Sequence, residues 1–182
     1  MKILIGVTSS IAAYRIPNLI SALKKEGHEI KVIVTEHAKA FVAPQAIAVM
    51  SKNPCFTDQD EWNNTERVLH IELAKWCDVF LIAPLSANTL AKISNGMCDN
   101  LLTSTVRALG DKKLIIAPAM NTRMWENAFT KIHIDLLGRI YNLDIIEPVS
   151  KRLADGDEGI GGLADDETII KAIRLFSKSG KQ

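Results

Sequence analysis

Short apolar runs, each about the length of a β-strand, recur along this chain at 2–7, 29–35, 79–83, 113–117 and 143–146. Uninterrupted runs of this kind are typical of strands that are buried on both faces of a sheet. Helical patterns lie between them, and strands that alternate with helices join through right-handed crossovers into a parallel sheet. The sequence therefore predicts an α/β fold with a doubly wound, mostly parallel sheet and helices on both faces.

The helical patterns fall at 44–50, 86–94, 100–109, 127–140 and 166–176, with another directly after the first strand. In that first one, Ile16, Leu19, Ile20 and Leu23 have the i, i+3, i+4, i+7 spacing of an amphipathic helix. Gly27 follows this pattern, as is typical of the C-terminal end of a helix. Because of Pro17, the sequence does not fix the first residue of the helix to within several positions.

Two stretches, 53–67 and 149–163, fit no regular element. The first is polar around Trp62, and the second carries glycines among arginine and acidic residues. Long irregular segments in a compact domain are usually functional loops. We expect each stretch to be a lid or a binding flap, with a surface excursion as the alternative.

Composition limits the classes of protein to which the chain can belong. Its 182 residues, 47% of them hydrophobic, suffice for one domain with its own core, which we expect to span 1–182. Lysine and arginine total 22 against 21 acidic residues, and no segment concentrates the basic ones, which argues against a nucleic-acid partner. No apolar stretch reaches the roughly 18 residues of a membrane span, so no membrane partner is expected.

Cys55, Cys77 and Cys98 form no CxxC motif and no cluster with histidine. The sequence therefore indicates neither a disulfide framework nor a metal site, and a reducing compartment fits best. The opening segment has too short an apolar run for a secretory signal. We expect a cytoplasmic protein.

Polar side chains follow several of the predicted strands, at the carboxyl edge where open parallel sheets bind ligands. Ser9 and Ser10 follow the first strand at a helix start that can hold a phosphate, although helix capping alone would also explain them. Ser86 opens the helix after the third strand, and Asn121 follows the fourth, near methionines and a tryptophan. This repetition of polar helix starts predicts a ligand site.

Two ring side chains have more than one interpretation. Phe41, after the second strand, either belongs to the core, the usual place for a lone Phe, or faces a flat ligand. His70 lies among apolar neighbours, where a hydrogen-bonded structural histidine is the common explanation. With an ordinary pKa of about 6.5, the same side chain would also serve as a general base near neutral pH.

Several motifs together resemble one family. Residues 70–73 (His-Ile-Glu-Leu), 84–89 (Pro-Leu-Ser-Ala-Asn-Thr), 96–102 (Gly-Met-Cys-Asp-Asn-Leu-Leu) and 118–125 (Pro-Ala-Met-Asn-Thr-Arg-Met-Trp) resemble the flavin-containing cysteine decarboxylases. The similarity runs from Lys2 to about Phe176, and 151–164 is similar to the substrate clamp of the branch that acts on pantothenoyl substrates. The resemblance implies a Rossmann-like flavoprotein, a lyase of coenzyme A biosynthesis.

The resemblance also implies FMN as the cofactor and a set of residues that hold it. These are Ser9, Ser10 and Ile11 from the first strand-end loop, Thr35, Glu36, His37 and Phe41 from the second, Ser86, Ala87, Asn88 and Thr89 from the third, and Ala119 from the fourth. Phe41 would then pack against the flavin ring. Family members form homotrimers, or trimers of trimers, with shared sites, so His70 and Asn121 of one site would come from different chains.

The implied reaction converts 4'-phosphopantothenoylcysteine to 4'-phosphopantetheine with loss of CO2. Oxidation of the CH2–SH group to a thioaldehyde provides an electron sink β to the carboxylate, with the flavin as two-electron acceptor. By resemblance, His70 is the base of this step, and Asn121 holds the carboxylate or amide of the substrate. Met124 and Ala154 complete the substrate pocket.

One residue departs from the family pattern. Where the clamp usually reads Leu-Ala-Cys-Gly, with the cysteine as proton donor of the last step, this chain has Asp155. An ordinary aspartate has a pKa of about 3.9, so at neutral pH it has no proton to give unless its surroundings raise that value. Three explanations stay open: Asp155 acts as an acid, the enzyme stops at the enethiol, or the aspartate is an engineered substitution.

Two other functions also stay open. A peptidyl-cysteine decarboxylase of the lantibiotic type would stop at the enethiol without that cysteine, but the glycine-rich clamp argues against it. A regulatory subunit that binds a protein phosphatase is the non-catalytic alternative. Such regulators usually carry long acidic extensions, which this sequence does not contain.

Overall fold

The computed structural model describes residues 1–63, 66–154 and 156–179. At its centre is a sheet with the strand order β3 (Cys55–Phe56), β2 (Glu29–Val34), β1 (Lys2–Val7), β4 (Val79–Leu85), β5 (Lys113–Pro118) and β6 (Asn142–Ile145). Each neighbouring pair is parallel, with Ile5 opposite both Val32 and Leu81. Chain order reverses between β1 and β4, so the predicted doubly wound parallel sheet is confirmed.

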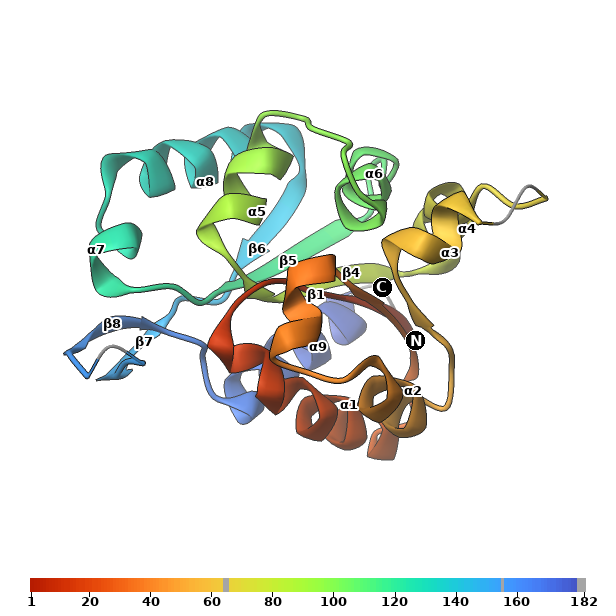
Figure 1. Cartoon of the computed structure of the whole chain (residues 1–182), viewed down its shortest axis with the longest axis horizontal. Helices are drawn as coiled ribbons and strands as arrows, with labels where there is room; N and C mark the ends of the chain where they lie inside the picture. The colour runs from red at the N-terminus through yellow and green to blue at the C-terminus, as the bar shows by residue number, and fades with distance from the viewer. Residues whose placement is uncertain (64–65, 155, 180–182) are drawn as a thin grey trace.

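Helices cover both faces of this sheet (Figure 1). On one face lie α1 (Ile16–Lys25), α2 (Pro44–Ser51) and α9 (Asp166–Ser179), and on the other α4 (Leu69–Trp76), α5 (Ala87–Ser94), α6 (Leu101–Arg107) and α8 (Ala128–Ile140). Successive side chains of β1 point to opposite faces, so Ile3 and Ile5 belong to one core and Leu4 to the other. Two-sided burial is the reason that the strands are continuously apolar.

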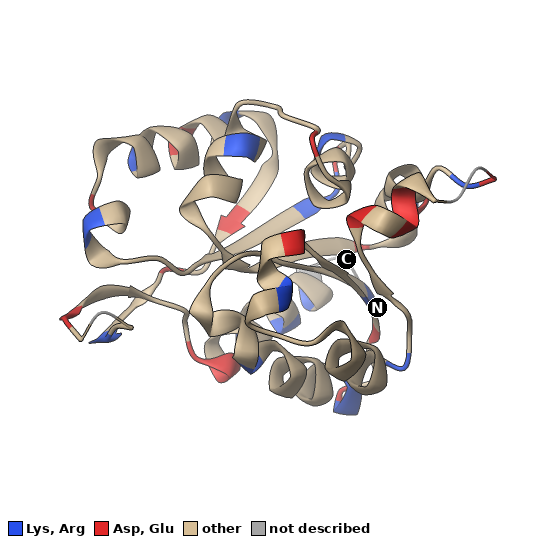
Figure 2. Ribbon diagram, in the orientation of Figure 1, with Lys and Arg blue, Asp and Glu red and all other residues tan. Residues whose placement is uncertain are grey.

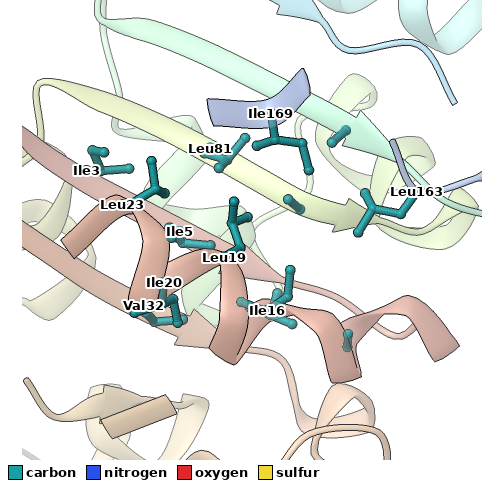
Figure 3. Packing of buried hydrophobic residues seen from close by; sticks show 14 of the residues in the cluster. Ile3, Ile5, Ile16, Leu19, Ile20, Leu23, Val32, Leu81, Leu163 and Ile169 are labelled. Carbon is teal, nitrogen blue, oxygen red and sulfur yellow. The ribbon is translucent and has the colours of Figure 1, made fainter. Parts of the chain in front are cut away.

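Helix α1 shows how the amphipathic pattern becomes packing. Ile16, Leu19, Ile20 and Leu23 are fully buried in a cluster with residues of β1, β2 and β4 (Figure 3). Burying an aliphatic side chain of this size contributes roughly 1.5–3 kcal/mol relative to leaving it exposed. Pro17 lies in the first turn of α1, where its missing N–H breaks no helical hydrogen bond.

Several predicted helix starts are N-cap residues. Ser86, Asn100 and Asn127 each accept a hydrogen bond from a backbone N–H in the first turn of α5, α6 and α8. The helices predicted at 44–50 and 166–176 are α2 and α9. Of the helices that the structure describes, none combines the length and apolar character needed to cross a bilayer.

The expectation of an irregular stretch at 53–67 is wrong. β3 pairs with β2 at the edge of the sheet, and α3 (Asp58–Trp62) follows it. A capping box starts α3, with Asp60 accepting a hydrogen bond from the Thr57 N–H at 2.7 Å. Elements this short show no periodicity, so only the cap residues could have indicated the helix.

The expectation that 149–163 contains no regular element is also wrong. β7 (Val149–Arg152) and β8 (Glu158–Gly162) form an antiparallel hairpin. The Met120 N–H, in the segment after β5, donates to the Gly161 carbonyl at 2.9 Å. Gly161 has a φ of +148°, and a Cβ there would lie 2.2 Å from the Met120 carbonyl oxygen, so this approach requires glycine.

Candidate functional site

A cavity of about 660 Å³ opens beside the point where the strand order reverses. Its walls come from the segments after β1, β4 and β5 and from the β7–β8 hairpin. The described lining residues are Ser9, Ser10, Ile11, Ala12, Tyr14, Arg15, Ser86, Ala87, Asn88, Ala119, Met120, Asn121, Met124, Lys151, Arg152, Leu153, Ala154, Gly161, Gly162 and Leu163. The volume is in the usual range of sites for cofactors and small molecules.

Buried Thr8 connects two walls of this cavity. Its hydroxyl donates to the Pro84 carbonyl at 2.7 Å and accepts from the Ser86 N–H at 2.8 Å. Because β1 and β4 are neighbours, their carboxyl ends bring the two segments together. The segment that carries Ser9 is thereby fixed relative to the start of α5.

Helix capping explains one of the predicted serines and not another. Ser86 accepts a hydrogen bond from the Thr89 N–H at 3.3 Å at the start of α5. Ser10 precedes the 3-10 helix η1 (Ile11–Arg15) but makes no side-chain capping bond. Capping therefore does not account for the Ser10 hydroxyl at the cavity wall.

Asn121 precedes the short helix α7 (Thr122–Trp125) in the wall formed after β5. Its carboxamide oxygen accepts a hydrogen bond from the Arg123 N–H at 2.8 Å, which orients the side chain. Met124, 49% exposed, and Ala154 of the hairpin line the same cavity. Asp155 lies outside the described residues.

Arg15 of the wall was not indicated by the sequence, and Lys151 was indicated only as part of the 151–164 clamp segment. Arg15 donates to the Leu163 carbonyl at 2.9 Å and to Asp166 Oδ1 at 2.6 Å, which joins η1 to the segment after β8. The side chain of Lys151 passes directly over Gly162. Burial and the Arg15 guanidinium lower the pKa of Lys151. Only the tertiary fold brings these two cations to one cavity.

The predicted flavin residues of the second loop lie outside the described cavity wall. Thr35, Glu36, His37 and Phe41 occupy the 3-10 helix η2 (Glu36–Ala40) and its two ends. Phe41 is 38% exposed, so its interpretation as a core residue is wrong. Thr89 is buried next to Ser86 and does not line the cavity.

His70 lies in the first turn of α4, a helix that the sequence did not indicate. Its ring Nδ1 contacts Glu61 Oε1, and its backbone N–H donates to Glu61 Oε2 at 3.1 Å. The side chain is 28% exposed, so it is only partly buried. Figure 1 places α4 at the opposite end of the molecule from α7 and the hairpin. A single chain therefore does not bring His70 and Asn121 together.

Within the described residues, no group of three or more His, Cys, Asp or Glu side chains is placed to hold a metal ion. The chemistry of the cavity comes instead from hydroxyl, amide and cationic groups at its wall.

A doubly wound parallel sheet with such a cavity at its switch point defines the class of nucleotide- and flavin-binding α/β proteins. The sequence pattern of the family described as "Flavoprotein" matches residues 1–177. Phosphopantothenoylcysteine decarboxylase of Mus musculus is 43% identical over 186 residues, which cover 98% of this chain and 89% of the mouse protein.

Solved structures give the same result. A cysteine-to-serine mutant of PPC decarboxylase, complexed with pantothenoylaminoethenethiol, has a TM-score of 0.89 and 42% identity, covering 97% of this chain and 98% of the other. The FMN binding protein AtHal3 has a TM-score of 0.86 and 42% identity, over 98% and 97%. Peptidyl-cysteine decarboxylase EpiD has a TM-score of 0.79 and 29% identity, covering 93% of this chain and 96% of the other. This chain belongs to the flavoprotein family and, within it, to the phosphopantothenoylcysteine decarboxylases, which confirms the resemblance.

Proposed function

We infer that this chain is a lyase of coenzyme A biosynthesis that uses FMN to decarboxylate 4'-phosphopantothenoylcysteine, with 4'-phosphopantetheine as the product of the complete reaction. Its near-complete similarity to phosphopantothenoylcysteine decarboxylases supports this reaction. The structural observation that carries it is the cavity between the strand-end segments and the β7–β8 hairpin. The cavity offers a cofactor-sized site whose outer wall is the predicted substrate clamp.

The residues of the cavity fit a flavin mononucleotide. Ser9 and Ser10 offer hydroxyl groups for its phosphate, and Asn88 offers an amide in the wall that starts α5. We extend the binding set to Ile11, Ser86, Ala87 and Ala119 in the wall, to Thr89 beside it, and to Thr35, Glu36, His37 and Phe41 in the neighbouring segment. When bound, the flavin supplies the two-electron acceptor for the CH2–SH group of the substrate.

The substrate side of the cavity is the wall formed after β5 and by the hairpin. The bond from Arg123 N–H orients the Asn121 carboxamide, which we propose holds the carboxylate or amide of the substrate. Met124 and Ala154 then flank the same substrate. Fixed polar contacts of this kind accelerate a reaction by holding the reacting groups in place.

Assembly would supply each cavity with its base. His70 and Asn121 lie at opposite ends of one chain, so we propose a homotrimer, or a trimer of trimers, in which His70 of one chain serves the cavity of its neighbour. A cytoplasmic location and a single domain over 1–182 stay predictions.

The last step requires a proton without the usual clamp cysteine. None of the three cysteines, all of which are described, lines the cavity, and burial raises the pKa of Cys55 and of Cys77 to about 11. The described wall of a single chain also contains no Asp, Glu or His, and in the assembly proposed above the neighbour's His70 is the base of the oxidation step. Since an ordinary aspartate at 155 would be ionised, we propose that the reaction stops at the enethiol.

Product analysis tests this function. Anaerobic incubation of the FMN-loaded protein with 4'-phosphopantothenoylcysteine should release CO2, bleach the flavin absorbance and give a product two hydrogens lighter than 4'-phosphopantetheine. Asp155→Cys should then form 4'-phosphopantetheine. Steady formation of that product by the unmodified protein would contradict the arrest. A colourless protein that takes up no FMN would contradict the function itself, and CO2 released only from a peptide ending in cysteine would indicate peptidyl-cysteine activity.

A further inference from the structure

Glu61 binds His70 through both of its carboxylate oxygens. It belongs to α3, on which acidic residues gather (Figure 2). Oε2 accepts from the backbone N–H of His70 at 3.1 Å, and Oε1 contacts His70 Nδ1. The Glu61 side chain is only 10% exposed. With both oxygens engaged, the carboxylate has little freedom to rotate, and the imidazole is held in one orientation.

The contact selects one tautomer of the imidazole. An ionised carboxylate only accepts hydrogen bonds, so the ring nitrogen that faces it carries the hydrogen. In the neutral ring, Nε2 then has the lone pair. We propose that Glu61 is a positioning residue that keeps His70 in the Nδ1–H tautomer and so makes Nε2 the proton acceptor. The use of Nε2 as a base rests on the proposed function, whereas the tautomer follows from the contact alone.

Helices α3 and α4, which carry Glu61 and His70, are each held in place by further hydrogen bonds to other parts of the chain. Asp58 Oδ1 accepts from the Leu101 N–H at 2.9 Å, which ties α3 to the start of α6. At the other end of α4, Lys112 Nζ donates to carbonyl oxygens of the last turn and of Cys77 at 2.6–2.8 Å. This rigidity matters to a base, because a misplacement of about 1 Å can cost about 10²-fold in rate.

A purely structural role would make Glu61 a cap of α4. Val68, the N-cap residue, makes no side-chain capping bond, so Glu61 does satisfy a backbone N–H of the first turn. Capping requires only that backbone contact. The second contact, to Nδ1, contributes nothing to the helix start, and the two roles therefore differ in what they predict for the ring nitrogens.

The test uses the FMN-loaded full chain labelled with ¹⁵N in its histidines. Two-bond ¹H–¹⁵N correlation spectra, taken where the rings are neutral, distinguish Nδ1–H from Nε2–H, and the signals missing in His70→Asn assign His70. Glu61→Gln keeps the size of the side chain, removes its charge and adds a donor. Glu72→Gln is the matched control, because Glu72 lies on α4 but pairs with Arg67. Lys112→Met loosens α4 without changing the Glu61–His70 pair.

We expect the Nδ1–H tautomer in the unmodified protein and in both controls, and its loss in Glu61→Gln. Reduction of the flavin by substrate should slow by about 10²-fold or more in Glu61→Gln, with a melting temperature close to that of Glu72→Gln. An Nε2–H tautomer in the unmodified protein, or an unchanged tautomer in Glu61→Gln, would overturn the proposal. So would a changed tautomer with an unchanged rate. If the unmodified protein does not reduce its flavin, the proposed function fails, while the spectra still decide the tautomer.

Discussion

The strand-end wall of the cavity and the α3–α4 segment (residues 58–63 and 66–76) both supply predicted site residues, but different forces place them. Ser9 and Ser86 are brought together by strand order, since β1 and β4 are neighbours and their carboxyl ends meet. His70 is placed by polar contacts of a short helix, chiefly those of Glu61. Topology fixes the first region before any ligand binds, whereas single side-chain contacts fix the second.

The largest expected effect comes from the α3–α4 segment. His70→Asn should slow flavin reduction by substrate by about 10²- to 10⁴-fold, because it removes the proposed general base. FMN content should stay unchanged, since none of the residues proposed to hold the flavin is altered. Anaerobic stopped-flow absorbance and the flavin-to-protein ratio measure both. Rapid bleaching together with a lowered melting temperature would make His70 a structural residue only.

Gly161→Ala should break the clamp side of the cavity. The added Cβ would lie 2.2 Å from the Met120 carbonyl oxygen on a backbone of positive φ, so the hairpin has to move. A strain of about 1–3 kcal/mol corresponds to a roughly 5- to 150-fold rise in the substrate KM, with FMN retained.

Gly138→Ala is the control for that substitution, because its Cβ would approach nothing closer than 4.0 Å on an ordinary helix. Steady-state CO2 release gives both KM values. Equal values for the two variants would show that the docked hairpin does not shape the substrate site.

The same contrast explains what the sequence could predict. Both roles of Ser86, helix cap and cavity residue, can be predicted from the sequence, because an apolar strand of ordinary length directly precedes it. The role of Glu61 cannot be predicted in this way, since a five-residue helix shows no periodicity and the partner of Glu61, His70, lies on a different helix. The sequence around Gly161 is typical of a loop, because the reason that this position requires glycine is the close approach of Met120, which is distant in sequence. Local patterns reveal elements, and pairwise tertiary contacts remain hidden.

Thr8→Val should weaken the strand-end wall by a smaller amount. The Pro84 carbonyl keeps its hydrogen bond from the Thr8 backbone N–H at 3.2 Å, whereas the Ser86 N–H loses its partner, and an unsatisfied buried group costs about 1–3 kcal/mol. Urea unfolding of the FMN-loaded protein measures the loss. Thr105→Val is the matched control, because the buried Thr105 hydroxyl only donates to a helical carbonyl, that of Leu101. An equal loss in both variants would mean that Thr8 is no special link between the walls.

The smallest expected effect distinguishes the cavity end of α5 from its other end. Asn88→Leu removes an amide from the cavity, and the loss of one hydrogen bond of about 0.5–1.5 kcal/mol predicts a roughly two- to tenfold weaker FMN affinity. Asn95→Leu makes the same change at the opposite end of α5, where the side chain only donates to the Ala91 carbonyl, and should leave the affinity unchanged. Fluorescence titration of FMN into the flavin-free protein gives both constants. If the two variants bind FMN equally well, Asn88 does not contact the flavin, and the third strand-end segment contributes its position to the cavity without contributing a ligand.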